Sequence, residues 1–89
     1  MLTKYNSIGT IVDVRTPEEY EHNHVTGSIN IPLEVIRHRI SDFKEMYKPI
    51  VVYCRTGNRS GIAANLLKQY GISDVINGGS IDGVKRLRQ

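Results

Sequence analysis

The fold of this 89-residue chain is decided by the stretch IVVYCRTGNRS, residues 50–60. Its apolar part, residues 50–53, lacks alternation and predicts a strand that is covered on both faces. A short polar loop follows, and a helical pattern begins directly behind it. A helix N-terminus presents unpaired backbone N–H groups and the positive end of its dipole, so a thiol there should lose its proton more easily. We therefore interpret the loop as a socket for an anionic cysteine, Cys54, the only cysteine of the chain.

Around this stretch, strand patterns alternate with helical ones. Further strands are predicted at residues 11–14, 28–31 and 74–76, after which Gly78 and Gly79 should turn the chain into a final helix. Strands that alternate with helices favour a parallel sheet, and we expect a small three-layer α/β domain with helices on both faces. Ligands of such sheets bind at the carboxyl ends of the strands, where the Cys54 loop would lie. The length predicts a single domain, residues 1–89.

The helices are predicted from their caps and their apolar spacing. Thr16, Pro17 and Glu19 form a helix start with a capping box. Gly71 is well placed to end the helix that follows the Cys54 loop. Two apolar stripes at helical spacing predict the helix bodies: Leu33, Ile36, Ile40 and Phe43 form the first, and Ile62, Ala63, Leu66, Leu67 and Tyr70 form the second.

The length of the cysteine loop carries chemical information. Arg59 follows Cys54 with four residues between them, whereas the similar loop of cysteine phosphatases has five, which gives a ring of amides wide enough for a phosphoryl group. The residue at that later position is Ser60, a type that caps helices rather than clamping phosphate. A ring from Cys54 to Arg59 suits a smaller group, such as one added sulfur atom.

With this loop, the chain resembles the rhodanese family of sulfurtransferases. The resemblance extends, in the family's order, to residues 11–20 (IVDVRTPEEY), 24–32 (HVTGSINIP) and 74–79 (DVINGG). It implies a small α/β domain with a parallel sheet and a persulfide on the loop cysteine, and it assigns His24 to structure rather than catalysis.

The chain departs from the family pattern at several positions. Asn23 and Thr26 stand where the family usually has glycine and proline, and no tryptophan follows the double glycine. The segment before Ile11 is short for the family's usual leading strand and helix. These departures concern the edges of the sheet and the last helix, and they do not touch the loop.

The residues that we expect to bind the substrate around Cys54 are Arg55, Thr56, Gly57, Asn58, Arg59 and Ser60. Arg59 should fold back and pair with a carboxylate that holds the loop closed, and Asp13, which ends the first strand at the same sheet edge, is the expected partner. Arg55 should point outward toward an anionic donor, and Gly57 lets the backbone turn without a Cβ clash.

Other charged residues are expected to be structural or solvated. Arg15 and Glu19 are predicted to form a surface ion pair. The basic cluster Lys85, Arg86 and Arg88 fits a solvated helix end, because no zinc spacing, recognition helix or aromatic–basic interleaving indicates nucleic-acid binding. His22 and His38 lie in polar surroundings and should be exposed. One cysteine and scattered histidines also give no metal-ligand spacing.

The bulk properties set further expectations. No apolar run approaches the roughly 18 residues of a membrane span, and the N-terminus lacks the apolar core of a signal peptide. A single cysteine excludes an intrachain disulfide. A reducing cytoplasmic setting is the simplest interpretation, and it suits a working thiol.

The function predicted from these features is transfer of a sulfane sulfur from a donor such as thiosulfate to a thiol or cyanide through a Cys54 persulfide. No cofactor is needed, because the cysteine carries the sulfur. An alternative is a persulfide carrier or docking module that serves one partner protein and turns over thiosulfate poorly. Phosphatase chemistry is disfavoured by the loop length and arsenate reduction by the missing second cysteine. A catalytically silent regulatory domain is disfavoured because the nucleophile is present.

Overall fold

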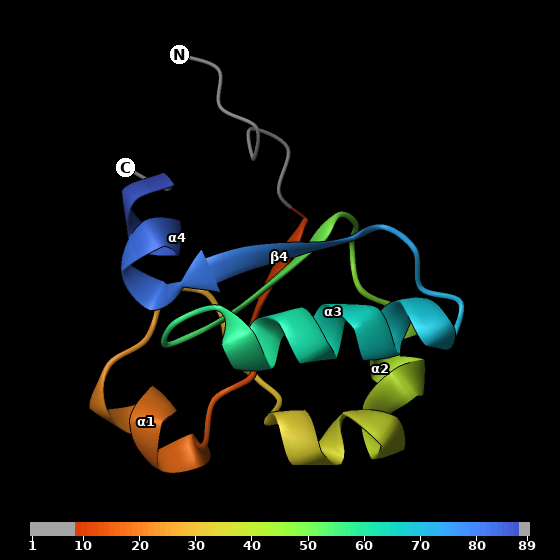
Figure 1. Cartoon of the computed structure of the whole chain (residues 1–89), viewed down its shortest axis with the longest axis horizontal. Coiled ribbons are helices and arrows are strands. Elements are labelled where there is room, and N and C mark those ends of the chain that lie inside the picture. Colours follow the sequence, from red (N-terminus) through yellow and green to blue (C-terminus); the bar gives the residue numbers. More distant parts are fainter. Residues whose placement is uncertain (1–8, 88–89) are drawn as a thin grey trace.

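The computed structural model describes residues 9–87 and places a four-stranded parallel sheet at the centre of the molecule (Figure 1). The strands are β1 (Thr10–Asp13), β2 (Ile29–Asn30), β3 (Ile50–Cys54) and β4 (Val75–Ser80), in the order β2-β1-β3-β4. All pairings are parallel, so the carboxyl ends of β1 and β3 meet at one edge of the sheet. The predicted parallel sheet is confirmed. Compared with the predicted strands, β1 is displaced by one residue, β2 is shorter, and β4 is longer.

Helices cover both faces of the sheet, which confirms the three-layer α/β architecture. They are α1 (Pro17–His22), the 3₁₀ helix η1 (Leu33–Arg39), α2 (Ile40–Lys44), α3 (Asn58–Gln69) and α4 (Ile81–Leu87). Residues of η1, α2 and α3 pack in one buried cluster with one face of the sheet. Residues of α4 pack in a second cluster on the other face, and Figure 1 shows α4 at the end of β4, apart from α2 and α3. Within the described part of the chain, no helix has the length and apolarity that a membrane span needs.

The central strand β3 is buried along its whole length, as its continuous apolar run predicts. Its side chains alternate between the two clusters. Val52 and Cys54 belong to the cluster under η1, α2 and α3, whereas Val51 and Tyr53 belong to the cluster under α4. Because β3 contributes to both cores, the strand is held from both sides of the sheet, whereas the Cys54 side chain itself packs in the cluster under η1, α2 and α3.

Two predicted helix ends are confirmed in detail. Thr16 caps α1 through the expected capping box with Glu19, and Pro17 occupies the first turn. Gly71, which follows the C-cap residue Tyr70 of α3, adopts a positive φ of 89°. Its N–H bonds to the carbonyl of Lys68 and the N–H of Ile72 to that of Leu67, the pair of contacts that defines a Schellman end.

The stripe predicted for α3 is confirmed at Ala63 and Leu67, which are buried, and at Leu66, which packs against the same core, but it is wrong at its edges. Ile62 is 58% exposed and Tyr70 is 44% exposed, whereas the buried residues are Ser60, Ala63, Ala64 and Leu67. These four have the i, i+3, i+4, i+7 spacing of one helix face. The polar Ser60 breaks the apolar pattern of that face, because its hydroxyl is bound inside the site described below.

The predicted helix over residues 33–43 is two elements, η1 followed by α2. The spacing of three between Leu33 and Ile36 matches the three-residue turn of a 3₁₀ helix, and Ile36 and Phe43 are the buried residues of the two elements.

Gly78 and Gly79 lie inside β4 rather than in a turn before the last helix. The register places Asn77 opposite Val52 and Gly79 opposite Tyr53, so Gly78 is an extra residue in a β-bulge. A Cβ atom on Gly78 would lie 2.7 Å from a methyl carbon of Val51, so the close approach of β4 to the core requires glycine there.

Candidate active site

Cys54 is the last residue of β3, and its sulfur lies within the loop that leads into α3. The backbone N–H of Gly57 donates to Sγ over 3.0 Å, and the N–H of Ser60 reaches Sγ over 3.4 Å. The Ser60 hydroxyl oxygen lies 3.5 Å from the same sulfur. The loop therefore surrounds the sulfur with hydrogen-bond donors, as the strand–loop–helix order predicts.

These contacts act against each other on the acidity of the thiol. Burial disfavours the charged form, since Cys54 is only 1% exposed. The Ser60 hydroxyl, when its hydrogen is turned toward the sulfur, stabilises the thiolate together with the N–H groups of Ser60, Gly57 and Thr56. The net result is a lowered pKa for Cys54. A thiolate is the nucleophilic form of cysteine, so the loop favours reactivity.

Gly57 shapes the loop. Its φ of 102° lies in the left-handed region, and it occupies the N-cap position of α3. A side chain there would be strained, and its Cβ atom would come within 3.4 Å of the Cα atom of Gly79. The expected turning role of Gly57 is confirmed. Ser60 is not a cap, because α3 begins before it at Asn58.

Arg59 pairs with Glu19, not with Asp13 as expected. Its two terminal nitrogens lie 2.7 and 3.0 Å from the two carboxylate oxygens of Glu19, and this two-pronged contact ties α3 to α1. The guanidinium lowers the pKa of Glu19 to about 2, and Glu19 in turn raises the pKa of Arg59. Glu19 also accepts the N–H of Thr16, so one carboxylate serves both the helix cap and the loop.

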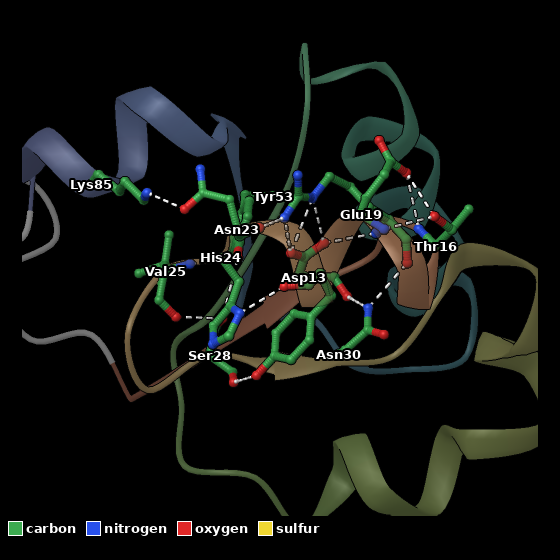
Figure 2. A network of polar contacts seen from close by, with 12 residues as sticks. Asp13, Thr16, Glu19, Asn23, His24, Val25, Ser28, Asn30, Tyr53 and Lys85 are labelled. Atoms are coloured by element: carbon green, nitrogen blue, oxygen red, sulfur yellow. Dashed lines mark hydrogen bonds and ion pairs between the residues drawn. The ribbon is translucent and has the colours of Figure 1, made fainter.

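Asp13 is unavailable to Arg59 because Arg15 occupies it. The Arg15 side chain bonds both carboxylate oxygens of Asp13 at 2.7–3.0 Å, and Arg15 also donates its backbone N–H to the same group. Both residues are buried, so the predicted surface pair of Arg15 with Glu19 is wrong as well. Figure 2 shows Asp13 at the centre of this network and Glu19 beside Thr16. Asp13 thus supports the turn between β1 and α1.

The remaining loop residues lie at the surface. Arg55, Thr56 and Asn58 are exposed, in agreement with an outward Arg55. A further residue of the site, Asn77 on β4, was not predicted. It bonds the Ser60 hydroxyl over 2.6 Å and the carbonyl oxygen of Gly57 over 3.2 Å. The predicted strand ends at residue 76, so Asn77 follows it directly at the expected carboxyl end, and that position is the sequence signal that would have indicated it.

The predicted structural role of His24 is consistent with its contacts. Its Nδ1 atom lies 2.7 Å from the carbonyl oxygen of Tyr20, and its ring stacks on the Tyr20 ring at 3.8 Å between centroids. His22 and His38 are exposed, as expected. Lys85 bonds the side chain of Asn23 and so joins α4 to the end of α1 (Figure 2).

Of the basic cluster predicted to be a solvated helix end, Arg86 is exposed and Arg88 lies outside the described residues. The short segment before Ile11 also lies largely outside them.

Comparison with known proteins identifies relatives of this chain. It is 38% identical over 74 residues to thiosulfate sulfurtransferase PspE of Escherichia coli (strain K12), covering 82% of this chain and 71% of PspE. It is 41% identical over 76 residues to thiosulfate sulfurtransferase GlpE of Pseudomonas syringae pv. syringae (strain B728a), covering 82% of this chain and 65% of GlpE. It is also 41% identical over 73 residues to adenylyltransferase and sulfurtransferase uba4 of Ogataea parapolymorpha, covering 76% of this chain but 18% of that protein.

Solved structures also include rhodaneses similar to this chain. A rhodanese from E. coli, determined with anions, superposes with a TM-score of 0.75 at 38% identity over 83% of this chain and 88% of that one. The sulfurtransferase names of these relatives support a rhodanese-like activity for the chain. The sequence profile of the rhodanese-like domain matches residues 1–85. The chain therefore belongs to the rhodanese-like domain family.

Proposed function

We propose that this chain is a sulfurtransferase that carries a sulfane sulfur as a persulfide on Cys54. The Cys54 thiolate attacks the outer sulfur of thiosulfate, the sulfur–sulfur bond of the donor breaks, and sulfite leaves with the electron pair. The negative charge then resides on the outer sulfur of the persulfide. A thiophilic acceptor such as cyanide removes that sulfur as thiocyanate and regenerates the thiolate, so no oxidant or cofactor is consumed.

The observation that carries this proposal is the ring of donors around Sγ. The N–H groups of Gly57 and Ser60 point at the sulfur, and the helix α3 begins behind them. Hydrogen bonds to an ionised acceptor are about twice as strong as neutral ones, so fixed donors favour the thiolate and any anionic sulfur bound to it. The exposed Arg55 lies at the loop, where its charge would attract an anionic donor.

Intact mass spectrometry after incubation with thiosulfate tests the proposal directly. We expect one added sulfur atom, removable by cyanide or by a reducing thiol, on the wild type and none on Cys54→Ser. Because the chain has a single cysteine, the added mass can be assigned without peptide mapping. An unchanged mass under conditions that load PspE would contradict the proposal.

The arrangement of Arg59 argues against the phosphatase alternative. A phosphatase needs its loop arginine to contact the phosphoryl oxygens, whose charge must be matched by donors in the transition state. Here both terminal nitrogens of Arg59 are bound by Glu19, and the loop is one residue shorter. We expect no appreciable hydrolysis of aryl phosphates. Inserting a glycine between Asn58 and Arg59 should abolish sulfur transfer by widening the ring.

A second candidate is delivery of the persulfide sulfur to one protein partner. The similarity to a segment that makes up 18% of uba4 favours it, since a domain of this kind there forms part of a larger protein. The burial of Cys54, 1% exposed, also limits access of large acceptors unless they dock at the loop. Rapid loading by thiosulfate with slow release to small thiols would favour the carrier. Rapid turnover with cyanide and small thiols would favour the free enzyme.

A further inference from the structure

The carboxamide of Asn77, an exposed residue of β4, makes three contacts, two of which reach the candidate active site. The backbone N–H of Gly79 donates to Oδ1 over 3.0 Å, and Nδ2 donates to the carbonyl oxygen of Gly57 over 3.2 Å. A flipped amide would place donor against donor and acceptor against acceptor, so these two contacts determine which atom is the oxygen. The third contact, from Oδ1 to the Ser60 hydroxyl, is the shortest at 2.6 Å.

This geometry determines where the Ser60 hydroxyl directs its hydrogen. A carboxamide oxygen can only accept, so the hydroxyl must be the donor to Asn77. Ser60 is fully buried and has one hydroxyl hydrogen. While that hydrogen points to Asn77, the hydroxyl faces Cys54, 3.5 Å away, with a lone pair. A lone pair suits a protonated thiol, which can donate to it, and it does not suit a thiolate.

We propose that Asn77 is a positioning residue that controls the ionisation of Cys54 by competing for the hydrogen of the Ser60 hydroxyl. In the thiol form, the bonds run from Cys54 to Ser60 to Asn77. When Cys54 loses its proton, the hydroxyl rotates toward the sulfur and gives up its bond to Asn77. The inference deepens the proposed function, on which its relevance to catalysis rests, because the ionised thiol is the group that would accept the sulfur.

Two features of the backbone place Asn77 in this position. The extra residue of the β-bulge, Gly78, follows it directly, and bulges re-aim the side chains beside them. Gly61 of α3 leaves room for the amide, since a Cβ atom there would lie 3.3 Å from Nδ2 of Asn77. Glycine at these two positions, one next to Asn77 in β4 and one in α3, therefore favours the contact.

The charged groups around the loop do not replace this control. Arg59 of α3 is paired with Glu19 of α1, and Asp13 at the end of β1 is paired with Arg15. Arg55 of the loop is exposed, which screens its charge. In contrast to these charged groups, the uncharged Ser60 hydroxyl contacts Sγ directly, and Asn77 sets the direction of its hydrogen.

Titration of the thiolate by its ultraviolet absorbance tests the proposal, because the chain has one cysteine and the measurement needs no sulfur donor. Asn77→Ala removes the competing acceptor, so the pKa of Cys54 should fall, with the ionisation constant rising about 3- to 10-fold. Asn77→Asp keeps an acceptor for Ser60 and adds a negative charge, so the pKa should rise. If Asn77 only holds the loop through Gly57, both variants lose that bond and both should shift the pKa upward.

A double-mutant cycle with Ser60→Ala completes the test. In the Ser60→Ala background, Asn77→Ala should no longer lower the pKa of Cys54, because the hydroxyl is absent. A rise or no change with Asn77→Ala alone, or the same fall in both backgrounds, would overturn the proposal. Asn65→Ala, at an exposed position on α3, is the matched control and should leave the pKa unchanged. If the predicted shifts occur in a protein that takes up no sulfur, the proposed function fails and the role of Asn77 stands.

Discussion

Replacement of Glu19 by glutamine should measure what the ion pair with Arg59 contributes to stability. Glutamine retains one oxygen that can accept the N–H of Thr16, so the capping box survives, but its amide nitrogen cannot accept from Arg59. The charge and one hydrogen bond of the pair are therefore lost. The fall of the Glu19 pKa from 4.5 to about 2 corresponds to about 3–4 kcal/mol at about 1.4 kcal/mol per unit, before screening by solvent is considered. The paired side chains are 30% and 35% exposed, and exposed ion pairs contribute about 1 kcal/mol or less. We therefore expect Glu19→Gln to lower the free energy of unfolding by about 1–2 kcal/mol at neutral pH.

The pH dependence has a defined sign. The pKa of Glu19 is lower in the folded chain, so its stabilisation is complete above 4.5 and disappears as the pH falls through about 2. The difference in stability between wild type and Glu19→Gln should therefore shrink by more than half at about pH 3. At pH values above about 6 the difference should be constant.

Urea unfolding followed by far-ultraviolet circular dichroism suits a chain without tryptophan. Glu18→Gln is the matched control, since Glu18 is the exposed neighbour in the same first turn of α1 and lacks the contact to Arg59. Equal stabilities of Glu19→Gln and Glu18→Gln at neutral pH would refute the reasoning. A difference that persists unchanged at about pH 3 would refute it too.

The other predictions concern the nucleophile, the second core and the bulge. Cys54→Ser should abolish thiosulfate-to-cyanide sulfur transfer with a native circular dichroism spectrum, because a hydroxyl does not ionise near neutral pH; residual transfer would contradict the mechanism. Tyr53→Phe leaves the buried N–H of Val25 without the phenol oxygen 3.0 Å away and should cost about 1–3 kcal/mol in urea unfolding. Gly78→Ala places a Cβ atom 2.7 Å from a methyl carbon of Val51 and should cost about 1–3 kcal/mol, whereas a stable variant would show that β4 can shift.

Local patterns predicted much of the fold. The uninterrupted apolar run of β3, the capping box of Thr16 and the glycine after α3 each depend on neighbouring residues, and each is confirmed. The β-bulge at Gly78 was not predictable in this way, because the need for glycine arises from Val51, a residue far away in the sequence. The exact edge of the face that α3 buries was missed for a similar reason, since the polar Ser60 lies at an inner position that an apolar pattern does not indicate.

In the candidate site too, features that depend on neighbouring residues were predicted, and features that depend on distant residues were not. The loop order and the acidity expected for Cys54 follow from a strand that ends directly before a helix, and the structure lowers the pKa as expected. The partner of Arg59 required a choice among several carboxylates at one sheet edge. Asp13 lies in the first strand as expected, but it pairs with Arg15, only two residues away in the sequence. Arg59 pairs with Glu19 instead. The pair of Arg15 with Asp13 joins residues close in the sequence, whereas the pair of Arg59 with Glu19 forms only because the fold brings α3 next to α1.

The alternation of β3 between two cores has a consequence for the mutational tolerance of the domain. Cys54 faces one core and Tyr53 the other, and Val25, Ile81 and Val84 lie with Tyr53. The departures from the family pattern, among them the missing tryptophan and the substitutions near Val25, concern segments that pack in this second core. We expect that substitutions in this second core can be accommodated by repacking against Tyr53, because the sheet separates this core from the sulfur of Cys54. Libraries that vary the α4 side should therefore retain the thiolate socket far more often than libraries that vary the α3 side.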